Sequence, residues 1–434
     1  MTSMVFSKQT HRPVIVAGGG PAGLMAAAEA ALAGRQVILL EKMPEPGRKL
    51  LITGSGRCNV TNACEPALLT DHFFSGGRFL RGAFSRFSNR DMAALLQRGG
   101  IRLVEEPEGK LFPESGKASD ILSFLHERAL SAGVRIMPGH SVRSIEMDQG
   151  RVVAVMTDRQ TFPAGAVILS TGGRSWPNTG SSGNGTRIAA SLGHAIISER
   201  PGLVPLLVPD PVLHALQGLV LRDVGLKLLL GGKVAAKSRG DLLITHFGIS
   251  GPVVLRLSRS IPDPFPGQPE AVSVEIDLAP DSSADVVDRS LLDLLAREPR
   301  KLLRNSLPTA EQIVCPAAFS AQLLRLAGLA GDLDGHSVTR RQRSQLLTTI
   351  KACRLPVSGT RGWREAIVTA GGVDLAEINP KTMASRLVPG LFFAGEVMDI
   401  DADTGGFNLQ AAWSTGYLAG RSAALHCLSS DNLL

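Results

Sequence analysis

Short apolar runs that end in glycine turns open the chain and return near its end. Residues 14–17 are an apolar run, which breaks into Gly18-x-Gly20-x-x-Gly23 and continues as a small-residue helical stretch. A second strand-like run, 36–40, is apolar from Val37 onward and is followed by Glu41. Two more, at 166–170 and 391–394, lead into Gly172 and Gly395. Uninterrupted apolar strands alternating with helices are typical of a parallel sheet buried on both faces. The pattern predicts an α/β fold with a Rossmann-type domain.

The middle of the chain has a different pattern. Residues 196–278 contain short apolar runs, many prolines and the alternation Val272-x-Val274-x-Ile276, which predicts antiparallel strands. Residues 284–351 show apolar positions at helical spacing, with Thr339 placed to cap the last helix. The proline-rich stretch 261–270 predicts a surface loop.

The first glycine turn has the spacing of a dinucleotide site. Gly18 permits the tight turn, Gly20 lets backbone N–H groups approach a pyrophosphate, and Gly23 lets the helix pack against the strand. Pro21 and Ala22 begin the helix whose N-terminus would hold the phosphates. About twenty residues later Glu41, followed by Lys42, is placed to accept the ribose hydroxyls, which favours FAD or NAD over a 2′-phosphorylated nucleotide.

Two later segments favour FAD. The strand at 166–170 leads into Thr171 and Gly172, as is common where a flavoprotein chain returns to its nucleotide domain. The strand at 391–394 leads into Gly395 and Glu396, whose carboxylate is placed to accept hydrogen bonds from ribityl hydroxyls. The turn residues Gly405 and Gly406 then open a helix at Phe407 and Asn408, which would aim free N–H groups at the flavin pyrimidine.

The block 47–62 is the best candidate for further flavin contacts. Its three cations have no acid beside them, its glycines allow backbone to lie close to the ring, and its polar residues could satisfy the ring edges. The residues concerned are Arg48, Lys49, Arg57, Gly54, Gly56, Asn59, Thr61 and Asn62. The alternative interpretation is an ordinary surface loop. We expect an FAD-binding domain from 1–195 and 356–434, a β-rich substrate subdomain at 196–280 and a helical subdomain at 281–355.

Several blocks together resemble the BaiN/YhiN-like (aminoacetone oxidase-like) family of NAD(P)/FAD-dependent oxidoreductases. They are 47–62, 112–121, 172–194, 240–259, 369–399 and 404–420, so the resemblance covers nearly the whole chain. One departure is Thr186, where the family pattern carries an aromatic residue. The resemblance implies three substrate classes: a uracil C5–C6 bond in ribosomal RNA, reduced to dihydrouridine; a steroid-like enone; and a small amine such as aminoacetone.

Composition indicates where such an enzyme would act. The five cysteines are odd in number and form no CxxC pair, so they predict reduced thiols and a cytoplasmic protein. Residues 1–13 lack the apolar core of a signal peptide, and no run of eighteen apolar residues predicts a membrane span. Three segments are rich in arginine and lysine, at 78–102, 297–304 and 340–354. They are typical either of a solvated surface or of contact with a polyanion such as ribosomal RNA.

The expected chemistry is hydride transfer at FAD. The chain has one dinucleotide fingerprint, so NADPH or NADH would visit transiently rather than occupy a domain of its own. Reduction of a carbon–carbon double bond also needs a proton donor, for which Cys58 and His246 are the candidates. Each also has a structural alternative. Cys58 could be a small packed residue, and His246 could be a structural loop histidine whose hydrogen bonds are satisfied. We expect no metal. The alternatives in function are a small-molecule flavin oxidase or reductase and a non-catalytic FAD-containing module that binds RNA or protein.

Overall fold

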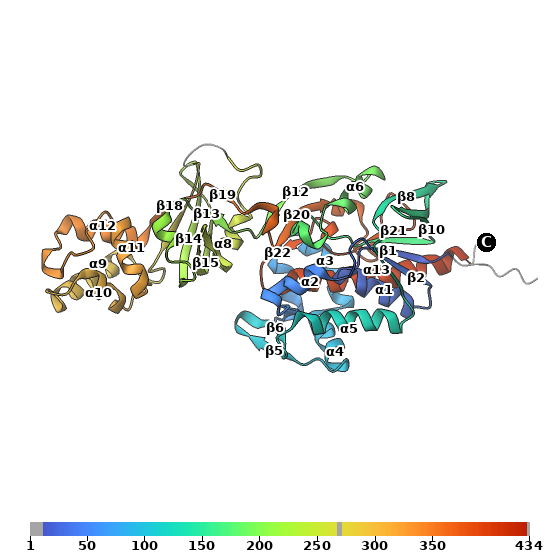
Figure 1. Cartoon of the computed structure of the whole chain (residues 1–434), viewed down its shortest axis with the longest axis horizontal. Coiled ribbons are helices and arrows are strands. Elements are labelled where there is room, and N and C mark those ends of the chain that lie inside the picture. Colours follow the sequence, from blue (N-terminus) through green and yellow to red (C-terminus); the bar gives the residue numbers. More distant parts are fainter. Residues whose placement is uncertain (1–11, 267–270, 432–434) are drawn as a thin grey trace, which may run out of the picture. The chain divides into compact units, whose positions relative to one another are not determined.

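The computed structural model describes residues 12–266 and 271–431, which form two compact units. The first unit combines the residues up to Arg200 with those from Val368 onward, and the second comprises Pro201–Ile367. Each unit has a hydrophobic core of its own. The second unit is therefore an insertion in the first, as the colours of Figure 1 let the reader follow.

A five-stranded parallel sheet forms the centre of the first unit. In spatial order its strands are β21 (Leu391–Phe393), β11 (Ala166–Leu169), β1 (Val14–Ala17), β2 (Val37–Glu41) and β7 (Arg135–Pro138). All neighbouring pairs run parallel, and Val14 is in register with both Ala166 and Val37. The predicted Rossmann-type α/β class is confirmed.

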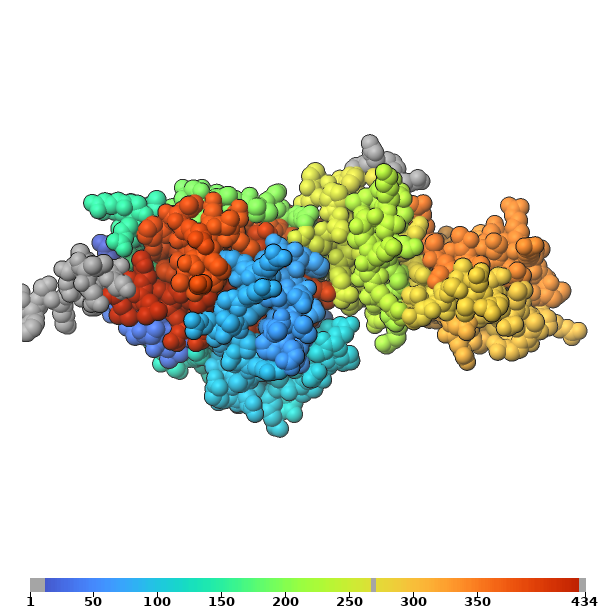
Figure 2. Space-filling view, turned by 180° about the vertical axis from the view of Figure 1, so that it is seen from behind, coloured from blue at the N-terminus to red at the C-terminus, as the bar shows by residue number. Residues whose placement is uncertain are grey.

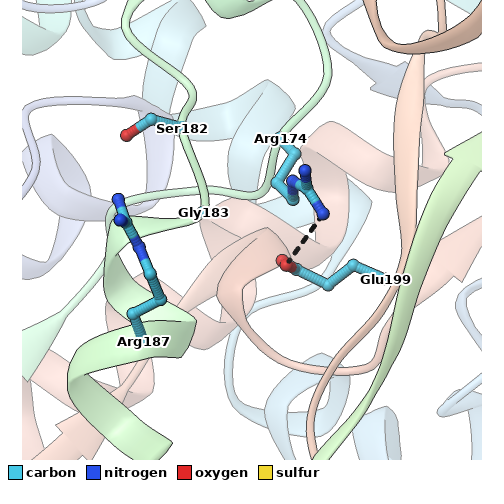
Figure 3. A pocket seen from close by; sticks show the side chains of 5 residues that line it. All are labelled: Arg174, Ser182, Gly183, Arg187 and Glu199. Carbon is cyan, nitrogen blue, oxygen red and sulfur yellow. Dashed lines mark ion pairs between the residues drawn. The ribbon is translucent and has the colours of Figure 1, made fainter.

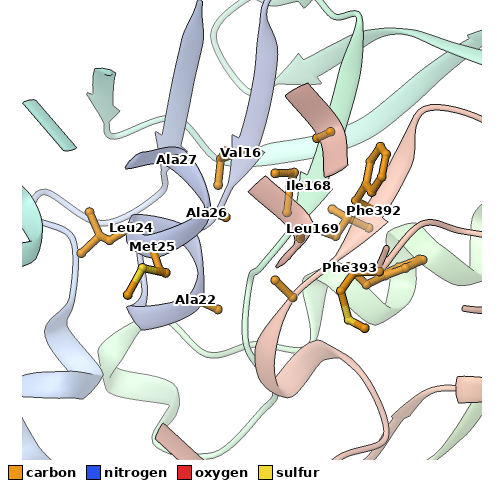
Figure 4. Packing of buried hydrophobic residues seen from close by; sticks show 14 of the residues in the cluster. Val16, Ala22, Leu24, Met25, Ala26, Ala27, Ile168, Leu169, Phe392 and Phe393 are labelled. Carbon is orange, nitrogen blue, oxygen red and sulfur yellow. The ribbon is translucent and has the colours of Figure 1, made fainter. Parts of the chain in front are cut away.

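Two helices from opposite ends of the sequence pack closely in this unit. They are α1 (Pro21–Leu32), which begins directly after the glycine turn, and α13 (Phe407–Asp431). Cβ atoms added to Gly416 and Gly420 of α13 would overlap the carbonyl oxygens of Ala22 and Ala26 in α1. Figure 4 shows α1 side chains in the core with residues of β11 and β21. The two helices can therefore approach this closely only because glycine occupies both α13 positions.

Among the residues that the structure describes, the first unit also contains four smaller sheets and, besides the short α2, four further α-helices. Two of the sheets have three strands: β8 (Val142–Asp148) with β9 (Arg151–Thr157) and β10 (Thr161–Pro163), and β3 (Thr61–Asn62) with β6 (Lys110–Pro113) and β5 (Leu103–Glu106). The other two have two strands: β4 (Phe73–Ser75) with β22 (Asp401–Ala402), and β12 (Ile196–Gly202) with β20 (Val368–Val373). The helices, apart from the short α2 discussed below, are α3 (Gly77–Arg86), α4 (Asn89–Arg98), α5 (Ala118–Ser131) and α6 (Asn184–Ser191).

The second unit is built on a seven-stranded antiparallel sheet, as its alternating pattern predicts. In spatial order the strands are β18 (Cys353–Pro356), β17 (Val272–Asp277), β14 (Val220–Leu230), β15 (Lys233–Thr245), β16 (Gly248–Ser250), β13 (Leu206–Leu207) and β19 (Gly359–Thr360). Its helices are α7 (Pro211–His214), α8 (Pro252–Ser258), α9 (Ala284–Arg297), α10 (Leu303–Ser306), α11 (Ala317–Leu326) and α12 (Arg340–Lys351). The helices share one core with the sheet, to which β18 and β19 are added after the last helix.

The predicted helix cap and part of the predicted loop are described in the second unit. Thr339 caps α12, because its hydroxyl accepts the Gln342 N–H while the Gln342 side chain accepts from the Thr339 N–H. The part of the expected loop at 261–266 contains neither helix nor strand. The rest of it, 267–270, lies outside the described residues. Among the described helices, none has the length and apolar character needed to cross a membrane.

Candidate functional site

The glycine turn after β1 has the geometry that its sequence predicts. Gly18 has φ +105°, and a Cβ there would lie 2.7 Å from the carbonyl oxygen of Ser170. A Cβ at Gly23 would overlap the carbonyl oxygen of Gly18. A Cβ at Gly20, in contrast, would meet no atom within 4 Å. Gly18 and Gly23 are thus required by packing, whereas Gly20 faces open space at the start of α1.

This open space fits a dinucleotide pyrophosphate. Gly20 is the N-cap of α1, no side chain caps this end, and Pro21 occupies the first turn. The N–H groups of a helix first turn carry partial positive charge and bind phosphate oxygens well. The N–H groups of Gly20 and Ala22 are therefore predicted to hold the pyrophosphate of FAD, while Pro21, which has no N–H, fixes the first turn. FAD when bound supplies hydride-transfer chemistry.

Glu41 is fixed at the end of β2 by backbone donors. Its Oε2 accepts the Gly19 N–H at 2.7 Å, and its Oε1 accepts the Met43 N–H at 2.8 Å. A carboxylate has about four acceptor positions, so two remain for ribose hydroxyls. The Nζ of Lys42 donates to Ser182 Oγ at 2.9 Å, and burial lowers the pKa of this ammonium. The carboxylate thus links the glycine turn to the predicted ribose position.

The block 47–62 is not a loop throughout, which corrects the simplest alternative interpretation. Gly47 has φ +74° and is followed by a short helix, α2 (Arg48–Ile52), and a 3₁₀ turn, η1 (Thr53–Gly56). Gly54 and Gly56 have φ +55° and +86°, and Ser55 between them has φ +58°. Serine rarely adopts this left-handed backbone conformation. Strained residues of this kind tend to cluster at functional sites.

Two of the three cations in this block have acidic partners far away in sequence. The Nζ of Lys49 lies 2.8 Å from Glu396 Oε2, and Arg57 pairs with Glu106 and stacks 4.2 Å from the Phe112 ring centroid. Arg48 is exposed and makes no ion pair within the described part of the chain. The expectation that all three lack an acidic neighbour holds in sequence but not in space. Of the three, only Arg48 has no acidic partner among the described residues, so it is the cation predicted to meet a phosphate.

Glu396 is the centre of a polar cluster that the sequence did not indicate. Besides Lys49, its carboxylate accepts the Thr369 N–H at 2.6 Å and the Ser175 hydroxyl at 3.3 Å. Ser175 Oγ also accepts from Lys49 Nζ at 2.6 Å, and Thr369 Oγ1 accepts the Arg174 N–H at 2.8 Å. Ser175, Thr369 and Arg174 all follow or precede glycine pairs, which is the signal that could have identified them.

The Gly405–Gly406 turn lies against the end of the 47–62 block. A Cβ at Gly406 would lie 2.6 Å from the Thr61 carbonyl oxygen, and the Asn62 amide donates to the Gly405 carbonyl at 3.2 Å. With its amide oriented to satisfy both groups, Asn59 accepts the Gly406 N–H at 3.1 Å. The structure thus brings together Asn59, Thr61 and the start of α13, and their contact with a flavin stays a prediction.

The remaining residues of this turn have mainly structural contacts. The Asn408 amide donates to the Ala402 carbonyl and accepts its N–H, both at 2.9 Å, so it closes the loop 402–408. Phe407 is buried and stacks on His72 with ring centroids 3.8 Å apart. Thr61 is buried and its hydroxyl donates to Gln410 at 2.7 Å. Cofactor contact through these three side chains remains a prediction.

The ends of β11 and β21 meet at the start of α1. Gly172 and Gly395 have φ +68° and +72°, and a Cβ at Gly395 would lie 2.8 Å from the Cβ of Ala22. The Gly395 N–H donates to Thr415 of α13 at 3.0 Å. Thr171, directly before Gly172, is half-buried at the same edge. The C-terminal edge of the parallel sheet therefore gathers the predicted site, as in other open α/β folds.

The two candidate proton donors differ in surroundings. Cys58 is completely buried, and burial raises the pKa of its thiol to about 12. This geometry supports the packed-thiol alternative for Cys58. His246 is exposed in the second unit, between β15 and β16, where its ring packs edge-on against Phe247. Within the described residues, no group of three or more His, Cys, Asp or Glu side chains could hold a metal ion.

A search of known proteins gives matches along nearly the whole chain. The family model HI0933-like protein Rossmann domain matches residues 12–422. The 3-dehydro-bile acid delta(4,6)-reductase of Clostridium scindens is 32% identical over 94% of this chain and 98% of the relative. The ribosomal RNA dihydrouridine synthases of Escherichia coli and Haemophilus influenzae are each 33% identical, over 93% of this chain and 96% of each relative.

Solved structures share the fold at lower identity. The Mycobacterium smegmatis Sdh1 complex matches with a TM-score of 0.52 and 18% identity over 96% of this chain and 68% of that chain. The 3-ketosteroid delta1-dehydrogenase from Sterolibacterium denitrificans matches with a TM-score of 0.51 and 14% identity, over 95% and 99%. With the family match and the full-length relatives, the chain belongs to the HI0933-like Rossmann family of FAD-dependent oxidoreductases.

Proposed function

We propose that this protein reduces a carbon–carbon double bond with electrons from NADPH or NADH, and that uridine in ribosomal RNA is its substrate. In this reaction a hydride from the nicotinamide ends on one alkene carbon and a proton is added to its neighbour. The relative from Clostridium scindens is named a delta(4,6)-reductase and that from Escherichia coli a ribosomal RNA dihydrouridine synthase. Forming dihydrouridine from uridine is also the reduction of a carbon–carbon double bond. Arg48, Lys49, Glu41 and Glu396 would hold the FAD that mediates the transfer.

The observation that favours RNA over a small substrate is the exposed face of α3. Arg78, Arg81 and Arg86 are exposed on this helix and make no ion pair or hydrogen bond through their side chains within the described ranges. Leu80, Ala83 and Phe84 occupy its buried side. In Figure 2 the blue segment that contains α3 forms part of the visible surface of the first unit.

A further cation extends this face. A Cβ at Gly82 of α3 would lie 2.8 Å from the Pro380 carbonyl oxygen, which places the exposed Lys381 beside the same helix. We call Arg78, Arg81, Arg86 and Lys381 the α3 basic face. These four cations form no ion pair with any residue that the structure describes, which favours a polyanion, since phosphate contacts supply a large share of the affinity of nucleic-acid binding.

The basic segment 340–354 supports the alternative of a structural surface. Arg343 pairs with Asp288 at 2.8 Å, and Lys351 pairs with Asp277 at 2.8 Å. Lys351 also donates to the carbonyls of Ala279 and Ser282 at 2.7 Å each. Much of the positive charge at 340–354 is therefore used inside the second unit. Only some of the arginine and lysine side chains in the basic segments therefore remain available to contact RNA.

The decisive experiment is a dihydrouridine map of ribosomal RNA with and without the gene. We expect one discrete site to be lost and to be restored by the purified yellow protein with NADPH. An unchanged map would remove RNA as the substrate. A steroid-like enone would then be tested as the second candidate, because the Clostridium scindens relative is named for such a reduction. Peroxide formation with an amine and no pyridine nucleotide would instead indicate an oxidase.

The α3 basic face gives a second test with a matched control. The triple variant Arg78→Gln/Arg81→Gln/Arg86→Gln should weaken binding of a ribosomal RNA fragment and reduce the slope of log K against log salt by roughly 2–3. The control Arg300→Gln/Arg340→Gln/Arg341→Gln removes the same charge from exposed positions of the second unit. An equal loss in both variants would show that α3 is not the RNA contact.

A further inference from the structure

A pocket of about 270 Å³ lies in the first unit, between α6 and β12. It is lined by Arg174, Ser182, Gly183, Arg187 and Glu199, which Figure 3 shows from close by. None of these residues belongs to the glycine turn after β1 or to the 47–62 block. The pocket borders the site described so far, because Ser182 accepts from Lys42 and the Arg174 N–H donates to Thr369 beside Glu396. The side chains that line it have been given no role there.

Positive charge predominates in this pocket. The guanidinium groups of Arg174 and Arg187 flank it, as Figure 3 shows. Arg187 makes no ion pair among the described residues, and its side-chain hydrogen bond to Asn184 is long, at 3.4 Å. Lys42 adds a third cation through its 2.9 Å hydrogen bond to Ser182. The one acid, Glu199, lies 4.0 Å from Arg174.

Glu199 is held in place by Thr186, at the start of α6. Thr186 is buried, and its hydroxyl lies 2.9 Å from the Gly183 carbonyl and 3.3 Å from Glu199 Oε1. The Glu199 side chain is 11% exposed, and burial raises its pKa. A carboxylate so placed partly neutralises Arg174 when no other anion is present.

We infer that this pocket binds a phosphate ester, with Arg187 and Arg174 as the charged donors and Ser182 as a hydroxyl donor. The inference rests on the proposed function, which offers two sources of that chemistry: the 2′-phosphate of NADPH and a phosphodiester of the RNA. Arginine suits either source, because its planar donors match phosphate oxygens in pairs. An incoming phosphate competes with Glu199 for Arg174, so Glu199 weakens binding.

Two variants with opposite expected signs test this assignment. Arg187→Gln should raise the dissociation constant for the phosphate ester about tenfold, the usual loss for one charge-assisted hydrogen bond. Glu199→Gln keeps the side-chain shape and removes the competing charge, so it should tighten binding several-fold. Arg151→Gln, an exposed arginine of the same unit in β9, is the charge-matched control.

The first measurement uses inorganic phosphate as the probe and needs no turnover. Phosphate should raise the melting temperature of the wild-type holoprotein more than that of Arg187→Gln, and most for Glu199→Gln. Equal shifts in all variants would overturn the proposal. Loss of FAD from Arg187→Gln would also overturn it, because the pocket would then belong to the cofactor site.

Kinetics then distinguish the two sources. A raised KM for NADPH in Arg187→Gln, with KM for NADH unchanged, would assign the pocket to the 2′-phosphate. Weaker binding of the RNA fragment with unchanged KM for both nucleotides would assign it to RNA, and no change in either would contradict the inference. The proposed function fails separately, through an unchanged dihydrouridine map, since phosphate stabilisation is measured without RNA or nicotinamide.

Discussion

The Nζ of Lys49 lies 2.8 Å from Glu396 Oε2, although 347 sequence positions separate the two residues. Both side chains are about three-quarters buried, with exposed fractions of 24% and 22%. The pair joins the block after the glycine turn to the end of β21. It therefore fixes the orientation of the carboxylate expected to contact the cofactor.

Replacing Lys49 should weaken FAD binding. In Lys49→Gln the Glu396 carboxylate keeps its Thr369 and Ser175 partners but loses its cation, so it should reorient, and the dissociation constant for FAD should rise about tenfold. Fluorescence titration of the apoprotein with FAD measures this. The control is Lys301→Gln, which breaks a partly exposed ion pair with Glu298 in the second unit. Identical FAD affinities would show that the pair has no role in the site.

Replacing Glu41 should have a larger effect. Glu41→Ala removes the acceptor of the Gly19 and Met43 N–H groups as well as the predicted ribose partner. We expect FAD affinity to fall by more than about tenfold, because each charge-assisted hydrogen bond contributes roughly 1.5–3 kcal/mol. The absorbance ratio of flavin to protein after purification checks this, with the exposed Glu45→Ala as control. A fully yellow Glu41→Ala protein would contradict the assigned role.

Close packing of α13 on α1 should make Gly416 intolerant of even a methyl group. Gly416→Ala places a Cβ against the backbone oxygen of Ala22, which cannot move without shifting α1. We expect a loss of about 1–3 kcal/mol in unfolding free energy, as is usual for overpacked cores. Gly331→Ala is the control, because a Cβ there meets no atom within 4 Å. Denaturant titration that finds both variants equally stable would disprove the packing argument.

His194 should make the first unit less stable in acid. Its side chain is fully buried between Glu377 and Ser385, and burial lowers its pKa below the usual 6.5 despite the nearby carboxylate. The unfolded chain therefore binds a proton more readily than the folded protein. Stability is fully present above pH 6.5 and is lost as the pH falls through the lowered folded-state pKa.

The test compares melting temperatures between pH 8 and pH 5. Wild type should lose more stability over this range than His194→Gln, which cannot be protonated there. The exposed His336→Gln variant should instead follow wild type. A His194→Gln protein with the pH profile of wild type would contradict the prediction.

Cys58 should be dispensable for chemistry. The thiol is completely buried with a pKa of about 12, so it stays protonated and out of contact with solvent at neutral pH. We expect Cys58→Ala to keep kcat within about threefold and to lose roughly 1 kcal/mol of stability, because only a small buried group is removed. A loss of more than about a hundredfold in kcat with FAD still bound would instead identify Cys58 as the proton donor.

The sequence was most informative where the determinants are local. The glycine turn and Glu41 follow one another within 41 residues, and their roles depend on backbone geometry that each glycine must permit, as the positive φ of Gly18 illustrates. The strand at 391–394 was also predictable, since β21 (Leu391–Phe393) is a buried apolar run.

Contacts between distant segments were not predictable. Nothing near Lys49 in sequence indicates its pairing with Glu396, and nothing near Glu199 indicates that Thr186 would hold it. The helix α2 was missed because glycines on both sides of a five-residue segment look like a loop, whereas packing of Leu50 in the core stabilises the turn. Charge in the 340–354 segment could not be judged until the partners of Arg343 and Lys351 were known.

The insertion of the second unit determines the order in which the protein can be completed during synthesis. Pro201–Ile367 is one uninterrupted stretch, so its core is available as soon as that stretch has left the ribosome. The first unit must wait for β21 and α13, because these two elements supply its edge strand and the partner helix of α1. While the chain is being synthesised, the insertion can therefore be folded when the nucleotide-binding fold is still incomplete. Cofactor loading then becomes one of the last steps of biosynthesis.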